Sequence, residues 1–176
     1  MKPLSTEKEI ASYQRGVEQS IAGLDHTLEA GYLHIEKKYF VKGSTLDTTI
    51  LETPKGRLAV VDDLVQYISS KLEEILGFEL DNEEQRRIAF KHVIGASQLE
   101  LEVYFANDYK ALARGNMRAV FEKKKKETVR NIYSKVVLGA GLREDHKTGK
   151  LVKAKEEELS ARTGALQEIE EYAEAA

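Results

Sequence analysis

The chain has no cysteine and no tryptophan, and only two of its 176 residues are proline. Without cysteine the protein has no disulfide, no thiol nucleophile, no cysteine-ligated zinc and no iron–sulfur cluster. Proline interrupts helices and marks turns, so its scarcity favours long helices over a turn-rich β fold. The sequence therefore predicts an all-α protein.

Long apolar runs are also missing. No stretch approaches the ~18 apolar residues that a membrane-spanning helix requires, and the N-terminal residues lack the apolar core of a signal peptide. The charge is nearly balanced, with 27 Lys and Arg against 30 Asp and Glu and a net charge of −3. We expect a cytoplasmic protein or a soluble component of an assembly, without a membrane partner.

The N-terminal segment predicts one long helix over residues 6–40, because its apolar residues recur at alternating steps of three and four. A stripe of small residues, including Gly16 and Gly23, runs beside the apolar one. Glycine disfavours a helix by about 1 kcal/mol relative to alanine. We interpret the stripe as a close-packing seam and assign Gly16 and Gly23 to an oligomer or partner interface. The alternative is a loosely specified helix whose glycines have no packing role.

The segment after residue 45 allows two interpretations. Thr53-Pro54 has the pattern of an N-cap followed by proline at the first helical position. The apolar steps then continue to Ile75, and Gly77 follows as a stop signal, which favours a helix. The alternative is a β hairpin within residues 45–61.

Two further helices are predicted in the second half of the core. Asp81 and Glu84 have the spacing of a capping box, and the helix they start is expected to break at Gly95 or Ser97. The helical surroundings favour continuation of the helix over residues 99–109, and a short strand is the alternative there, because apolar residues alternate with glutamates.

A helical pattern then runs from Asp108 to Leu138 and ends at Gly139. Its apolar residues lie on one side before residue 123 and nearly on the opposite side after residue 126. We expect the helix to bend there, or its two halves to face different partners.

Beyond residue 150 the apolar stripe is narrow and the segment is heavily charged. Ordering a residue costs ~1–2 kcal/mol of backbone entropy, more than this stripe returns on burial. We therefore predict a protruding charged C-terminal helix over residues 150–174, docked on another subunit or protein. Its interface residues are Val152, Leu159, Leu166 and Ile169.

These predicted elements divide the chain into two parts. Residues 1–141 form a helical core domain, and residues 142–176 form a polar connector with a charged C-terminal helical arm.

No motif for catalysis or phosphate binding is present in the sequence. The four histidines, His26, His34, His92 and His146, lack the spacing of metal ligands, and no glycine-rich phosphate loop occurs. The hydroxyl side chains have no adjacent base that the sequence identifies. We expect a protein that is not an enzyme, with no cofactor, no metal and no small-molecule substrate.

Charge distribution is the one functional signal above background. Nine basic residues and only two acidic ones, Glu122 and Glu127, lie between residues 110 and 135. The candidate contact residues in this segment are Lys110, Arg114, Arg118, Lys123, Lys124, Lys125, Lys126 and Arg130. The segment either pairs with the glutamate-rich tail of its own or a neighbouring chain, meets nucleic-acid phosphates, or is a solvated helix without a partner.

The first of these interpretations leads to the main functional hypothesis. We expect a non-enzymatic helical interaction or structural protein that self-associates, as a homo-oligomer with coiled-coil character, or belongs to a larger assembly such as a viral or other particle. The alternative is a nucleic-acid-associated accessory protein that uses the basic helix 110–135.

Overall fold

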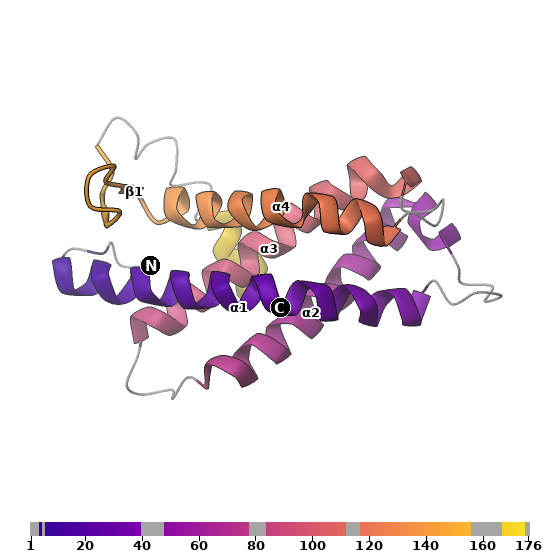
Figure 1. The fold of residues 1–176 in the computed structure, drawn as a ribbon, viewed down its shortest axis with the longest axis horizontal. Coiled ribbons are helices and arrows are strands. Elements are labelled where there is room, and N and C mark those ends of the chain that lie inside the picture. Colours follow the sequence, from indigo (N-terminus) through magenta and orange to yellow (C-terminus); the bar gives the residue numbers. More distant parts are fainter. Residues whose placement is uncertain are drawn as a thin grey trace.

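The computed structural model describes residues 4, 6–39, 48–77, 84–111, 117–155 and 167–174. Four long helices make up most of it (Figure 1): α1 (Glu7–Tyr39), α2 (Pro54–Leu76), α3 (Glu84–Ala111) and α4 (Met117–Gly139). The short 3-10 helix η1 (Thr48–Glu52) precedes α2, and strands β1 (Leu142–Glu144) and β2 (Leu151–Lys153) follow α4. Residues 167–174 form a further helix, called here the C-terminal helix.

Successive helices run antiparallel, as contacts between their ends show. Lys38 near the end of α1 donates to Asp63 in the first half of α2, with Nζ 2.6 Å from Oδ2. Arg87 near the start of α3 donates to Glu73 near the end of α2, and Lys124 of α4 donates to Asp108 near the end of α3. This is the up-down-up-down topology of a four-helix bundle, which confirms the predicted all-α helical bundle.

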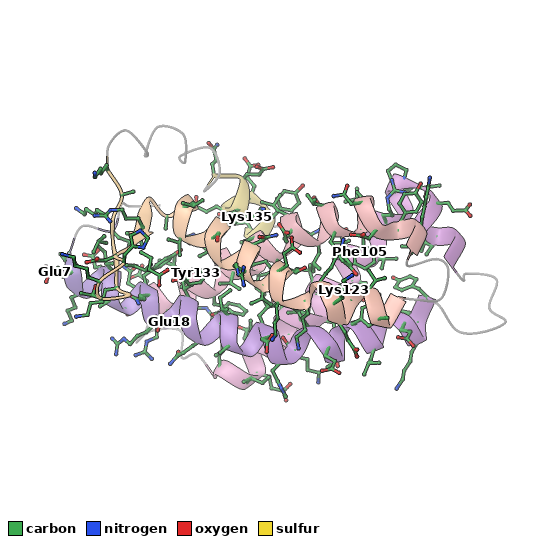
Figure 2. All side chains as sticks on the ribbon, turned by 45° about the horizontal axis from the view of Figure 1, so that its top comes forward. Glu7, Glu18, Phe105, Lys123, Tyr133 and Lys135 are labelled. Carbon is green, nitrogen blue, oxygen red and sulfur yellow. The ribbon has the colours of Figure 1, made fainter. Side chains whose placement is uncertain are left out.

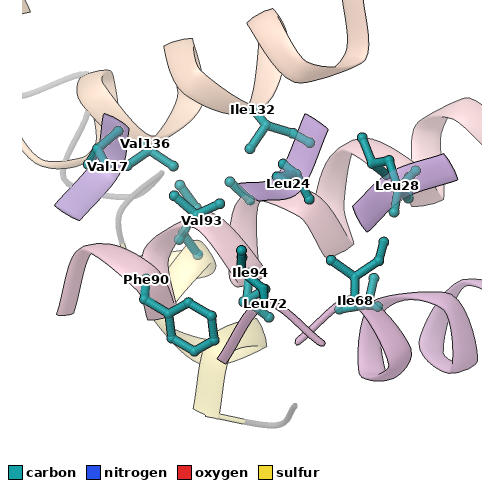
Figure 3. Close-up of a cluster of buried hydrophobic side chains, with 14 of the residues drawn as sticks. Val17, Leu24, Leu28, Ile68, Leu72, Phe90, Val93, Ile94, Ile132 and Val136 are labelled. Carbon is teal, nitrogen blue, oxygen red and sulfur yellow. The ribbon is translucent and has the colours of Figure 1, made fainter. Parts of the chain in front are cut away.

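The core is formed by apolar side chains from all four helices, which converge in Figure 3. α1 and α2 each contribute one stripe at steps of three and four, the spacing that places side chains on one face, whereas α3 is buried on nearly every side over residues 92–98. The innermost residues include Val17, Leu24 and Leu28 of α1, Ile68 and Leu72 of α2, Val93 and Ile94 of α3, and Ile132 and Val136 of α4. The long N-terminal helix predicted over residues 6–40 is thereby confirmed, and it contacts α2, α3 and α4.

The helix prediction after residue 53 is confirmed, and the hairpin alternative is wrong. Thr53 has extended backbone angles, and its hydroxyl oxygen accepts from the Gly56 N–H at 3.0 Å. Pro54 occupies the first helical position, where a missing N–H costs nothing. At the other end Gly77 adopts a left-handed conformation, with φ of 56°.

The N-cap gives a first testable prediction. Replacing Thr53 with alanine removes the acceptor of the Gly56 N–H and is expected to lower the free energy of unfolding by ~1 kcal/mol. Thr53→Ser keeps an acceptor and should stay close to the parent in chemical denaturation. Equal stability of the serine and alanine variants would show that the cap contributes nothing.

The break predicted in the second half of the bundle is wrong, and the helical continuation favoured after residue 99 is confirmed. α3 is continuous from Glu84 to Ala111, without a break at Gly95 or Ser97 and without a strand after residue 99. Ser97 fits in the helix because its hydroxyl donates to the Val93 carbonyl one turn earlier, at 2.7 Å. Asp81 lies outside the described residues, so its capping role is untested.

The single helix predicted from Asp108 to Leu138 is instead the end of α3 and the whole of α4. Within α4 the buried positions Phe121, Thr128, Ile132 and Val136 follow one stripe through the lysine run, and Val137, buried near the end of the helix, lies off it. The change of apolar face therefore arises because residues 109 and 129 belong to different helices, and no reversal of faces occurs within α4.

The prediction of a helix from residue 150 is wrong for its first part. β2 pairs with β1 in an antiparallel hairpin, with Arg143 opposite Val152. The side chain of Gln14 fastens this hairpin to α1, because its amide oxygen accepts from the Leu151 N–H at 2.8 Å. Leu142, Leu151 and Ile169 are buried in the same core cluster as the bundle, so residues on both sides of position 141 share one core.

Among the described helices, none has a stretch long and apolar enough to cross a membrane.

Candidate interaction site

Among the described residues of the predicted basic segment, three lysines form ion pairs with carboxylates of the same chain. Lys124 Nζ lies 2.8 Å from Asp108 of α3, and Lys125 Nζ lies 3.7 Å from Asp25 of α1. The third, Lys135, contacts the more deeply buried carboxylate of Glu100. These pairs lie on the sides of α4, between its buried stripe and solvent. Three of the nine basic residues between residues 110 and 135 are therefore paired with carboxylates of the same chain.

Lys135, labelled in Figure 2, pairs with a carboxylate of α3. Its Nζ lies 2.8 Å from Oε2 of Glu100, whose side chain is largely buried. The other carboxylate oxygen of Glu100 accepts from the Asn131 amide at 2.8 Å. Because both oxygens have donors, the burial of this carboxylate is compensated, and the contact fastens α4 to α3.

The cations that remain exposed on α4 form a row. Lys123, Lys126 and Arg130 are spaced at steps of three and four, on one side of the helix, and all three are exposed. No ion pair of these residues occurs within the described part of the chain. We call them the basic row, and Glu122 and Glu127 flank it on either side.

Of the remaining candidate cations, the structure describes the surroundings of one. Lys110 is exposed near the end of α3. Arg114 and the side chain of Arg118 lie outside the described residues.

The C-terminal helix lies on α3 through a buried isoleucine. Ile169 is only 1% exposed and sits where α3 has Gly95. A Cβ atom on Gly95 would overlap the carbonyl oxygen of Ile169, so the absence of a side chain at Gly95 lets the helix come this close. Ile169 is therefore a residue of the chain's own core, which corrects its assignment to a partner interface.

The other interface residues predicted for the arm divide differently. Val152 lies in β2 and is partly buried. Leu159 and Leu166 lie outside the described residues. The part of the predicted arm that is described as helix, residues 167–174, is folded back on the bundle.

Two polar contacts flank Ile169. Tyr172 donates its hydroxyl to Glu102 of α3 at 3.2 Å, and Glu170 Oε1 lies 3.5 Å from His92 Nε2. With these residues turned toward α3, Glu168, Glu171 and Glu174 are exposed. We call these three the acidic row. The C-terminal helix contains four glutamates and no Lys or Arg.

His92 is the centre of a buried polar chain. Its side chain is 3% exposed, and its Nδ1 lies 2.7 Å from the hydroxyl of Tyr13 on α1. Burial raises the pKa of Tyr13 far above its usual range and lowers the pKa of His92. Both groups are therefore neutral at pH 7, and Tyr13 can donate to an unprotonated Nδ1.

The glycines predicted to form an intermolecular seam lie inside the chain. A Cβ on Gly16 would come within 2.7 Å of the Arg86 Cα and 2.8 Å of the Ala89 Cβ on α3. A Cβ on Gly23 would overlap the Leu72 side chain on α2. Gly16 and Gly23 do mark close helix packing, but the neighbours are α3 and α2 of the same chain, so the assignment to a partner interface is corrected.

Sequence reasoning missed a second basic surface, on the β hairpin. Lys147, Lys150, Lys153 and Lys155 are all exposed. These lysines are visible in the sequence, but the connector and C-terminal helix predicted there do not bring them together, whereas the hairpin does. A groove of about 710 Å³ separates the hairpin from α1, and acidic side chains, Glu7 and Glu18 among them, line it together with Lys150 and Lys153.

A smaller hollow lies between α1 and α2, where the rings of His34 and Tyr67 stack at 4.4 Å. Asp63 at its edge accepts from Lys38 and Tyr39, which satisfies the carboxylate within the bundle. No group of three potential metal ligands is brought together in the described part of the chain.

Comparisons of the chain with protein-family models, with curated proteins and with solved structures give no match. The function therefore has to be argued from the exposed charges.

Proposed function

We propose that the protein is a non-enzymatic helical interaction protein that self-associates, with the acidic row of one copy against the basic row of another. The observation that supports this best is the presence of two exposed rows of opposite charge on two helices of one chain. Each copy then offers both halves of the contact, so the same pairing can extend to a larger assembly or close between two copies.

The two rows match in length as well as in sign. Lys123 to Arg130 spans seven residues, or about 10 Å of helix, and Glu168 to Glu174 spans six, or about 9 Å. Three ion pairs fit between helices laid side by side. An exposed pair contributes ~0.2–1 kcal/mol, so the row as a whole is expected to contribute about 2 kcal/mol, or about 30-fold in Kd.

The test is the molar mass in solution of the parent and of two triple variants. The basic-row variant is Lys123→Glu, Lys126→Glu and Arg130→Glu, and the acidic-row variant is Glu168→Lys, Glu171→Lys and Glu174→Lys. We expect the parent to self-associate at about 10 mM salt and to dissociate toward about 1 M, where the screening length falls to ~3 Å. Both variants should be shifted toward monomer at low salt.

Two control variants separate the rows from net charge. Lys37, Lys55 and Lys91 are exposed on other surfaces, and changing them to glutamate alters the net charge as much as the basic-row variant does. This control should associate as the parent does.

A second control changes the hairpin, with the substitutions Lys147→Glu, Lys150→Glu and Lys153→Glu. If the hairpin variant is monomeric while the basic-row variant still self-associates, the contact lies on the hairpin and the proposed pairing is overturned.

The nucleic-acid alternative is decided by the same proteins. Measurable DNA or RNA binding by the parent, lost in the basic-row variant while its self-association is unchanged, would overturn the proposed function in favour of that alternative. A parent that is monomeric at low salt would also overturn it.

A further inference from the structure

The C-terminal helix is joined to the bundle by contacts of two kinds. One is apolar, the insertion of Ile169 over Gly95. The other is polar and passes from Glu170 through His92 to Tyr13. Only the polar part changes with pH near neutrality, because histidine is the side chain that titrates there.

Neutral His92 can satisfy both of its hydrogen-bond partners when its ring hydrogen is on Nε2. Tyr13 on α1 donates its hydroxyl hydrogen to Nδ1, and the hydrogen on Nε2 points to Glu170. Protonation adds a hydrogen at Nδ1, so the Tyr13 hydroxyl has to turn and its own hydrogen loses its acceptor. Since Tyr13 is fully buried, that loss is not compensated by bulk water.

We propose that the C-terminal helix is an acid-sensitive latch, released from α3 when His92 becomes protonated. The helix covers Nε2 of His92 through Glu170, so its release gives the imidazole access to water. A protonated histidine is then better accommodated in the released state than in the docked one.

The electrostatic surroundings of His92 agree with this direction. Burial is the largest influence and lowers its pKa, whereas the carboxylate of Glu170 acts in the opposite sense. The docked state therefore binds fewer protons than the released state, whose histidine has an ordinary pKa of ~6.5. Docking is fully stable above that value and weakens as the pH falls below it, by no more than about tenfold per pH unit.

The test measures docking directly, with spin labels at two introduced cysteines, Ala106→Cys and Glu171→Cys. Both positions are exposed, and the parent chain has no cysteine that would react. Between about pH 7.5 and about pH 5, a longer label distance should appear, with the docked-to-released ratio falling at least about threefold. This range lies above the ordinary pKa of exposed glutamates, ~4.3.

Three variants make the result specific. His92→Gln does not titrate and should give a pH-independent distance distribution, whereas His26→Gln, at an exposed histidine of α1, should behave as the parent. Gly95→Ala introduces the Cβ that overlaps the Ile169 carbonyl, so this variant gives the label-distance distribution of the released state at every pH.

Two results would overturn the proposal. One is a parent label-distance distribution that is the same at both pH values, and the other is a pH response of His92→Gln equal to that of the parent. If His92→Gln fails to dock at neutral pH, an NMR titration showing the parent's His92 pKa at or above ~6.5 overturns it instead.

The latch also bears on the proposed function, because the acidic row lies on the helix that it releases. Weaker self-association near pH 5 than near pH 7.5 is expected, and this consequence alone rests on the proposed function. Release without an effect on association would leave the latch established and count against the pairing of the two rows.

Discussion

Replacing Gly16 with leucine is expected to lower the free energy of unfolding by about 3 kcal/mol, a shift in Tm of about 10 °C for a domain of this size. Even a single added carbon at Gly16 meets backbone, with the Arg86 Cα at 2.7 Å and the Arg86 carbonyl oxygen at 3.0 Å. Backbone atoms of a packed helix cannot move aside singly, so α1 and α3 have to separate. The gain of about 1 kcal/mol in helix propensity on replacing glycine is smaller than this loss.

A matched control is available on the same helix. Ala22 is exposed, so Ala22→Leu adds a large side chain to α1 without a clash and should leave the unfolding transition nearly unchanged. Thermal and denaturant unfolding of the two variants measure the difference. A Gly16→Leu protein as stable as the parent would show that α1 and α3 do not approach as closely as described.

Replacing Phe105 with alanine is expected to lower the free energy of unfolding by about 3–5 kcal/mol. Phe105 is fully buried in the bundle, and its ring meets that of Tyr104 edge-on at 5.4 Å. The substitution removes the ring's apolar area and leaves a cavity that the surrounding helices can fill only in part. Since small domains are typically stable by ~5–15 kcal/mol, this is a large fraction of the total.

Val103 provides the comparison for Phe105 on the same helix. It is 52% exposed, so Val103→Ala should change the free energy of unfolding by no more than about 0.5 kcal/mol. In denaturant titrations, the loss in free energy of unfolding should therefore be several-fold larger for Phe105→Ala than for Val103→Ala. Equal and small losses would mean that the end of α3 does not pack in the core.

The parts of the fold that the sequence predicts well are those with local signals. Thr53, Pro54 and Gly77 act on neighbouring backbone, and they fix both ends of α2. The sequence does not predict the boundary between α3 and α4, because the spacing of apolar residues shows that the apolar face changes but does not show why. A bend within one helix and a change from one helix to the next give the same pattern.

The candidate site was less predictable, because its determinants are distant in sequence. Lys125 pairs with Asp25 and Lys135 with Glu100, and no local pattern links these partners. The sequence therefore overestimated how much of the basic segment is available to a partner. The seam at Gly16 was visible, but spacing alone does not tell whether the second helix belongs to the same chain.

The most direct measurement of the central claim is the molar mass of a chain with both rows exchanged. This chain combines the basic-row and acidic-row variants, so its net charge remains that of the parent, −3, while the two rows stay complementary with signs reversed. We predict that it self-associates at low salt as the parent does, although each triple variant alone is shifted to monomer, and that it does not co-assemble with the parent. A folded, doubly exchanged chain that remains monomeric, as each triple variant does, would contradict the pairing of the two rows.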